Sequence, residues 1–361
     1  MEHGKEAPAG RKPELSILNV LFCLLVVLIH VLSHPVSTLD RSSWQFLTVL
    51  IPQRLAFAAV SGFFVLSGVK LCLTGDSRFS LSQYYKRRAK TLLLPYLLAM
   101  AVYYAYFIWR GYYTFSLGQL CQFWLVGDLS AHFYFVVALI QFVVLVPLWR
   151  VFVRKYDAVL ALPFALGLSW LCARYLGSFL ALLKPGLEFP YSDRVFATYL
   201  IYYLAGCYIG RNYQTFLTLL ERNKALIRVL FVTLTLADAV FSALLFSGRA
   251  AIPFLEEIHI GYQMSAILFC FQLAAQWKDR PLPRPVAELD SVSYLIYLYH
   301  CLAITEFNLM ADRMGINRVM VRLPLRAMFV YGGTVAGCLL WHRGILLLKA
   351  QLKRKEGTPH E

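Results

Sequence analysis

One apolar stretch near the start of the chain, Leu15 to His34, limits what this chain can fold into. Its length of about 20 residues matches the hydrocarbon core of a bilayer when the stretch is helical. At about 100° per residue, its polar side chains fall on one side of that helix: Ser16, Asn19, Cys23, His30 and Ser33. A polar stripe is costly in lipid unless it faces protein or water. We therefore predict that this helix lies inside a bundle and that its stripe lines a cavity.

The composition of the whole chain agrees with a membrane protein. Of its 361 residues, 59% are hydrophobic and only 15% are charged, against about 25% charged residues in soluble domains. The formal net charge is +15, but the basic residues lie mostly in short loops. They are explained by membrane topology and anionic lipid headgroups rather than by nucleic acid. Leu15 to His34 has no small-residue cleavage site after it, so we expect no signal peptide there.

The apolar runs predict an all-α polytopic bundle of about ten transmembrane helices. We expect a transmembrane domain over residues 15–348 between cytoplasmic tails, 1–14 and 349–361. A short surface helix is expected over Phe115–Val126. The predicted spans are Leu15–His34, Pro52–Leu73, Thr91–Trp109, Ala131–Trp149, Ala158–Leu176, Val195–Gly210, Ala225–Phe246, His259–Trp277, Pro285–Ile304 and Leu323–Leu348.

The distribution of Lys and Arg between alternate loops predicts the orientation. One set of loops carries roughly 23 basic residues and the other roughly 10, which places both termini in the cytoplasm. In that orientation His30, His132 and His300 share roughly one depth, in the outer half of the membrane. The basic run Lys86 to Lys90 then lies at the inner mouth of the third span.

Three histidines are candidate functional residues. His30 is the candidate general base, because imidazole titrates near neutrality and can take a proton from a hydroxyl group. Alternatively, it bonds a neighbouring helix or reaches the headgroups. His132, in HFYF, is a substrate-side candidate or an interfacial residue of an aromatic belt. His300 follows Ser293 and Tyr297 at helical spacing, and this stripe serves either substrate binding or hydrogen bonding between helices.

The basic run Lys86-Arg87-Arg88-Ala89-Lys90 is a candidate phosphate-binding site. Arg offers phosphate a bidentate fork and Lys offers it a point charge. The same run is also an ordinary positive-inside signal. Pro95 and Tyr96 follow one turn into the span, where proline frees a backbone carbonyl and bends the helix. That bend is expected to open room near the inner mouth.

The eight cysteines are scattered, mostly inside apolar spans. No CxxC pair occurs in the sequence, so neither a disulfide framework nor a zinc site is indicated, and we predict no metal. The sequence also has no Walker loop, GxSxG elbow, HExxH motif or Rossmann fingerprint.

Five segments resemble, in their order and spacing, the bacterial acyltransferase family 3 of integral membrane O-acyltransferases. The resemblance covers most of the chain. It implies transfer of an acyl group, usually acetyl, from cytoplasmic acyl-CoA to a sugar hydroxyl on the far side of the bacterial plasma membrane. It maps the family's histidine of span one to His30 and the first arginine of its RxxR motif to Arg87 or Arg88. The segments are LVVLIH ending at His30, FFVLSG at Phe63–Gly68, KRRAKTLLLPY at Lys86–Tyr96, HFYF at His132–Phe135 and SYLIYLYH at Ser293–His300.

Two positions depart from the pattern of this family. Asn19 stands where the family usually has an arginine, about three turns before the histidine. The second arginine of RxxR falls at Lys90 or Thr91, and Lys90 keeps the charge but lacks the bidentate fork. These departures leave open an altered substrate or an inactive member.

The resulting hypothesis is a multi-pass O-acyltransferase of the bacterial plasma membrane, with acetyl-CoA or another acyl-CoA as donor and no metal. His30 would deprotonate a hydroxyl of a cell-surface polysaccharide, peptidoglycan or lipid-linked sugar, with His132, His300 and Tyr297 on the acceptor side. A transporter or flippase for a glycan intermediate, and a membrane scaffold with a vestigial site, are the alternatives. The candidate residues for binding CoA are Lys86, Arg87, Arg88, Lys90, Tyr96 and Asn19.

Overall fold

The computed structural model describes residues 12–75, 79–186 and 188–356, and this part of the chain forms helices and no strand. Most of the predicted N-terminal tail, residues 1–11, and the last five residues lie outside the described residues. The elements in chain order are α1 (Pro13–Thr38), α2 (Trp44–Ala56), α3 (Ala58–Cys72), α4 (Leu81–Arg88), the π-helix η2 (Ala89–Leu93), α5 (Leu94–Trp109), α6 (Leu117–Val126), the 3₁₀ turn η3 (Ala131–Phe133), α7 (Tyr134–Val144), α8 (Val146–Lys155), α9 (Ala158–Leu183), the 3₁₀ turns η4 (Ser192–Arg194) and η5 (Phe196–Tyr199), α10 (Leu200–Arg211), α11 (Tyr213–Arg222), α12 (Lys224–Phe246), α13 (Leu255–Ala275), α14 (Arg284–Arg313) and α15 (Val319–Glu356).

Seven helical segments of the described chain are long and apolar enough to cross a membrane, and each overlaps a predicted span. An eighth is possible if α6 and the helix beginning at Ala131, which meet at 54°, count as one bent span. Of the other predicted spans, α10 has only 12 residues, and α14 begins with a polar segment. The all-α class is confirmed, whereas the count of about ten and the cytoplasmic termini stay predictions. The seven segments are Pro13–Thr38, Trp44–Cys72, Leu81–Trp109, Ala158–Leu183, Lys224–Phe246, Leu255–Ala275 and Val319–Lys349.

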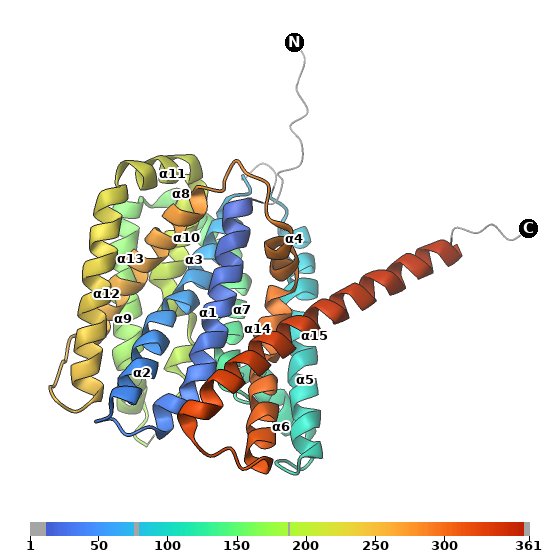
Figure 1. Cartoon of the computed structure of the whole chain (residues 1–361). Helices are drawn as coiled ribbons and strands as arrows, with labels where there is room; N and C mark the ends of the chain where they lie inside the picture. Colours follow the sequence, from blue (N-terminus) through green and yellow to red (C-terminus); the bar gives the residue numbers. More distant parts are fainter. Residues whose placement is uncertain (1–11, 76–78, 187, 357–361) are drawn as a thin grey trace, which may run out of the picture. The chain divides into compact units, whose positions relative to one another are not determined.

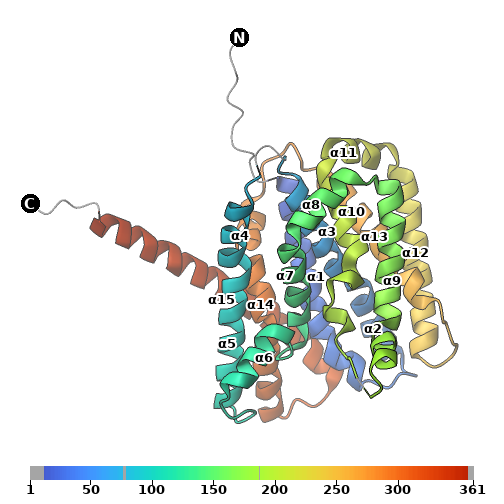
Figure 2. The ribbon, with the colours of Figure 1, turned by 180° about the vertical axis from the view of Figure 1, so that it is seen from behind.

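The chain divides into two compact units. The first unit comprises residues up to Phe57, Thr235–Ile258 and Phe269 onward, so it holds α1, α2, α14 and α15. In this unit α1 packs against α2, α14 and α15. The last part of α15 projects away from α1 and α14 in both views (Figures 1 and 2).

The second unit comprises Ala58–Leu234 and His259–Leu268, and it is built around the closely packed helices α3 and α10. A Cβ placed at Gly68 would overlap the carbonyl oxygen of Tyr203, and one at Gly206 would overlap that of Val65. Gly206 and Gly210 form a GxxxG spacing, which lets two membrane helices touch through their backbones. Gly68, the last residue of the FFVLSG segment, is therefore a packing residue of α3.

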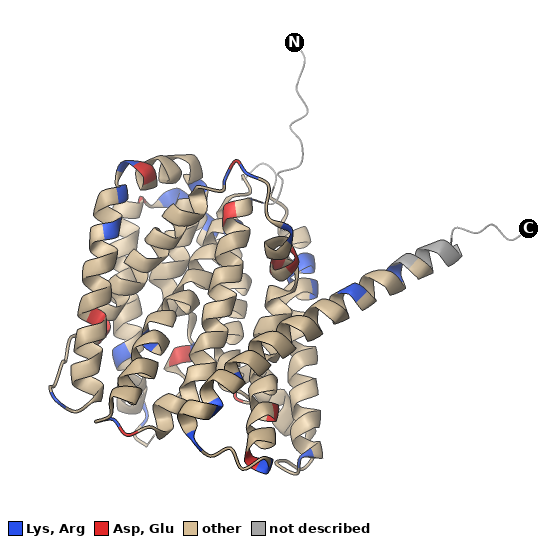
Figure 3. Cartoon of the chain, viewed as in Figure 1, with Lys and Arg blue, Asp and Glu red and all other residues tan. Residues whose placement is uncertain are grey.

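The basic segments of the second unit gather toward one of its ends. The helices α4, α8 and α11 lie toward the same end in both views, and α6 lies toward the other (Figures 1 and 2). Lys and Arg are concentrated along these basic helices (Figure 3). Within this unit, the arrangement agrees with the predicted alternation of basic and less basic loops. The predicted short helix near Phe115 is confirmed as α6, which begins at a Ser116 cap and ends at Gly127.

We predict opposite effects for the same Gly→Ala change at two helical positions. Gly206→Ala should lower the free energy of unfolding by about 1–3 kcal/mol, because the added methyl group forces α3 and α10 apart. Gly167→Ala, in α9 with nothing within 4 Å of the new Cβ, should raise it by up to about 1 kcal/mol through helix propensity. Unfolding of detergent-solubilised protein by sodium dodecyl sulfate measures both, and equal effects would contradict the packing.

Candidate active site

The polar stripe of α1 faces α14 inside the first unit. The Asn19 side-chain amide donates to Asp290 Oδ1 at 2.6 Å and to Ser293 Oγ at 2.8 Å. One turn further, Cys23 Sγ donates to the Ser293 carbonyl oxygen at 3.2 Å. These hydrogen bonds give Asn19 and Cys23 partners within the protein, which polar groups need where no water is present.

The same two helices bring His30 and His300 together. Their ring centroids lie 5.0 Å apart, with the ring planes at 52°. Asn19 and His30 are separated by about 17 Å of helix at 1.5 Å per residue, and Asp290 and His300 by a similar length. The two helices are therefore parallel and in register.

His300 is fixed by its own helix. It is fully buried, and its Nδ1 lies 2.7 Å from the Tyr297 carbonyl oxygen and 3.3 Å from that of Ile296. A carbonyl oxygen only accepts hydrogen bonds, so Nδ1 carries the proton and Nε2 carries the lone pair in the neutral ring. His30 is half-buried, so it is the member of the pair that a substrate reaches more easily.

Two candidates from the sequence have mainly structural contacts in the structure. Tyr297 is buried, and its backbone carbonyl, rather than its hydroxyl, orients His300. His132 lies in the second unit, where it is buried, and its Nδ1 is 3.1 Å from Ser130 Oγ. The prediction that His132 shares the depth of the other two histidines stays a prediction.

A buried arginine that the sequence analysis did not single out holds α1 just beyond His30. Pro35 lies inside α1 and has no N–H to give to the Val31 carbonyl, four residues earlier. Arg326 of α15, only 1% exposed, donates Nη1 to that carbonyl at 3.3 Å and Nη2 to Asn308 Oδ1 at 2.8 Å. An arginine at membrane depth marks a functional site by default, and the signal for it was the proline that frees a carbonyl.

The basic run lies where the helix changes its winding. Lys86, Arg87 and Arg88 end α4, and the π-helix η2 joins α4 to α5. The Leu94 amide reaches back five residues to the Ala89 carbonyl, beside Pro95, which has no N–H to donate. Such π turns are frequent at functional sites. The bend predicted from Pro95 is therefore a widened turn within one continuous segment, Leu81–Trp109.

The side chains of this segment differ in exposure. Lys86, Arg87 and Lys90 are exposed, whereas Arg88 is half-buried with its guanidinium 5.3 Å from the centroid of the Tyr84 ring. Tyr96 is buried and its hydroxyl donates to the Trp124 carbonyl of α6 at 3.0 Å. The cationic groups are thus placed to meet a ligand from outside the unit, and Tyr96 ties α5 to α6.

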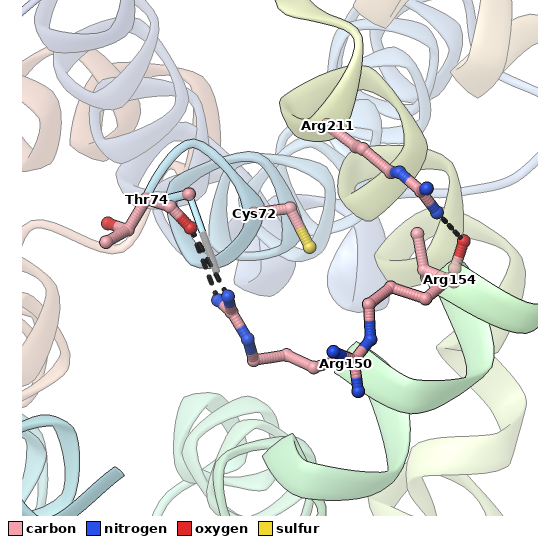
Figure 4. A pocket seen from close by; sticks show the side chains of 7 residues that line it. Cys72, Thr74, Arg150, Arg154 and Arg211 are labelled. Atoms are coloured by element: carbon pink, nitrogen blue, oxygen red, sulfur yellow. Dashed lines mark hydrogen bonds between the residues drawn. The ribbon is translucent and has the colours of Figure 1, made fainter. Parts of the chain in front are cut away.

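A basic pocket of about 120 Å³ lies where α3 ends, in the second unit (Figure 4). Arg150 of α8 donates to the carbonyl oxygens of Leu71 and Thr74, at 3.3 and 3.4 Å. Arg211 of α10 donates to the Val153 carbonyl. These bonds tie the end of α3 to α8 and α8 to α10. The lining residues are Cys72, Thr74, Gly75, Arg150, Val153, Arg154 and Arg211.

The fold and the site define a multi-pass, all-helical membrane protein with a histidine pair between the helices α1 and α14. A family model described as "Acyltransferase domain", that of acyltransferase family 3, matches residues 13–343, and the chain belongs to this family. It is 24% identical to a protein of Bacillus subtilis (strain 168) named "Putative membrane-bound acyltransferase YfiQ", over 80% of this chain and 79% of the relative. No solved structure gives a significant match. The resemblance drawn from the sequence motifs is thereby confirmed.

We predict that Pro35 and Arg326 are energetically coupled. Arg326→Met should destabilise the protein by about 1–3 kcal/mol, because a buried carbonyl loses its donor. In a Pro35→Ala background the new N–H can serve Val31 instead, so the same change should cost about 1 kcal/mol less. Unfolding free energies of the four proteins in detergent give the coupling, and equal costs in both backgrounds would rule it out.

Proposed function

We propose that this member of the acyltransferase family transfers an acyl group, with acetyl as the expected group, from cytoplasmic acyl-CoA to a hydroxyl of a cell-surface glycan or lipid-linked sugar. The observation that carries the proposal is the placement of His30. His30 is a half-buried imidazole in an apolar bundle. It lies beside the buried His300, whose tautomer is set by the Tyr297 carbonyl of α14. Family membership favours this enzyme over the transporter alternative.

The proposed chemistry needs one proton acceptor. His30 takes the proton of the acceptor hydroxyl as its oxygen attacks the thioester carbonyl carbon. The carbon–sulfur bond then breaks, and the proton leaves with the CoA thiol. His300 is a positioning residue in this scheme, because its burial keeps it from substrate and its Nδ1 is engaged by Tyr297.

The donor would bind through its phosphates at the basic run of α4 and η2. Arg88 is the leading residue, since its guanidinium is partly ordered against Tyr84 while three more cations lie beside it. The pantetheine arm would follow the stripe of α1 toward His30. Asn19 donates hydrogen bonds to Asp290 and Ser293 where the family usually has an arginine. In this chain it would therefore position α1 against α14 without adding a positive charge.

We predict that His30→Gln lowers acyl transfer by about 10²–10⁴-fold, the usual contribution of a positioned base. The measurement is mass spectrometry of surface glycans from cells that make equal amounts of each membrane-inserted variant. His342→Gln, the same exchange in α15, is the matched control and should keep full acylation. Full acylation by the His30 variant would remove this residue from the mechanism.

We predict that Arg88→Met weakens acetyl-CoA binding about tenfold, which corresponds to the loss of one charged hydrogen bond of about 1.5 kcal/mol. Arg88→Lys should recover part of the affinity, because lysine restores the charge without the fork. Arg222→Met, an exposed arginine of α11, is the control for charge alone. Titration of purified protein with acetyl-CoA measures the Kd, and equal effects of Arg88→Met and Arg222→Met would exclude a specific phosphate contact.

A further inference from the structure

A third ligating side chain lies against the histidine pair. Cys301 follows His300 in α14, and its Sγ is 3.3 Å from His300 Nε2. One ligand atom each from His30, His300 and Cys301 lies within 4.8 Å of the other two. These are two imidazole nitrogens and one sulfur, at the half-buried and buried positions of one helix interface.

The orientation of His300 is the one that a metal-binding histidine has. Histidines that bind a metal through one ring nitrogen usually donate the other ring N–H to a carboxylate or a backbone carbonyl. His300 does so through Nδ1 to Tyr297, which leaves the lone pair on Nε2, the atom beside Cys301. The Tyr297 carbonyl of α14 therefore makes Nε2 the His300 atom that can bind a metal.

The spacing of the three atoms suits a small tetrahedral ion. Zinc–nitrogen bonds of about 2.0–2.1 Å and a zinc–sulfur bond of about 2.3 Å place neighbouring ligand atoms about 3.3–3.6 Å apart. The pair formed by His300 and Cys301 already has a separation of 3.3 Å. All three ligand atoms lie within 4.8 Å of one another, so the His30 nitrogen needs to move by at most about 1.5 Å to reach these separations. Rotation of the half-buried His30 side chain is the motion that would bring it there.

We propose that His30, His300 and Cys301 form a binding site for a soft divalent cation of the Zn²⁺ type. Two neutral imidazoles and one thiolate bind the ion, the thiol proton is released to solvent, and water takes the fourth position. The sulfur and nitrogen donors select Zn²⁺ or Co²⁺ over Mg²⁺ and Ca²⁺, which prefer oxygen. No sequence motif predicts this site, since His30 and His300 are 270 positions apart.

A metal ion bound at this site would also affect catalysis, a step that rests on the proposed function. An ion at this site uses the lone pair of His30 that would accept the hydroxyl proton. Bound Zn²⁺ therefore inhibits acyl transfer, and a chelator restores it. The ion acts as a reversible inhibitor at the base rather than as a cofactor of the reaction.

Binding is tested with Co²⁺ as a spectroscopic substitute for Zn²⁺. Full-length protein without a histidine tag, stripped with chelator in detergent micelles, is titrated with Co²⁺ alone. We expect about one equivalent to bind, with visible bands of tetrahedral Co²⁺ and a near-ultraviolet band from sulfur to cobalt, and Zn²⁺ should displace it. Cys301→Ser should abolish the sulfur band and weaken binding by at least about tenfold. Cys270→Ser, also half-buried and in the first unit, is the control and should keep both.

The His30→Gln variant and an assay of acyl transfer distinguish failure of the metal-site proposal from failure of the acyltransferase proposal. His30→Gln should keep the sulfur band but bind Co²⁺ more weakly. Identical titrations of wild type and Cys301→Ser, or no tetrahedral spectrum, would overturn the metal site and leave the acyltransferase proposal intact. If the protein binds Co²⁺ specifically but transfers no acyl group, the acyltransferase proposal is overturned and the metal site stands.

Discussion

The first unit depends on hydrogen bonds that keep polar side chains satisfied between α1 and α14, away from water. A polar group without a hydrogen bond in lipid costs several kcal/mol. The bonds from Asn19 to Asp290 and Ser293 therefore constrain how α1 and α14 pack. They set the rotation and the axial position of two parallel helices. A slip of one residue would turn a side chain by about 100°. The hydrogen bonds of Asn19, about three helical turns before His30, therefore determine that His30 and His300 meet.

The second unit uses a different means to the same end. Its central helices α3 and α10 carry glycine where their backbones touch, so close packing replaces hydrogen bonding at that contact. Toward one end of this unit, arginines donate to backbone carbonyls of the chain, and the basic run lies toward the same end. A closely packed middle and a cationic end are what the proposed binding of CoA phosphates would require.

The sequence predicted the membrane-spanning helices and their polar faces, but not which side chains from distant parts of the chain would meet. Apolar runs located the spans because helices satisfy their own backbone in lipid, and the two polar stripes identified the faces of α1 and α14. No spacing rule pairs Asn19 with Asp290, because the two residues are 271 positions apart. Cys301 was one of several cysteines in predicted apolar spans, and Arg326 was not singled out within the predicted span Leu323–Leu348. Both become visible only through their neighbours, although Pro35 already signalled a carbonyl in need of a donor.

The π-helix at Ala89–Leu93 has a consequence for how relatives are aligned. A π turn holds about one more residue than an α turn, so α4 and α5 do not share one continuous helical phase. A relative without that additional residue would present its basic side chains rotated by about 100° around the axis. Two chains with the same letters in this motif can thus aim their positive charge at different neighbours, and substrate preference can diverge through a single insertion that leaves every cation in place.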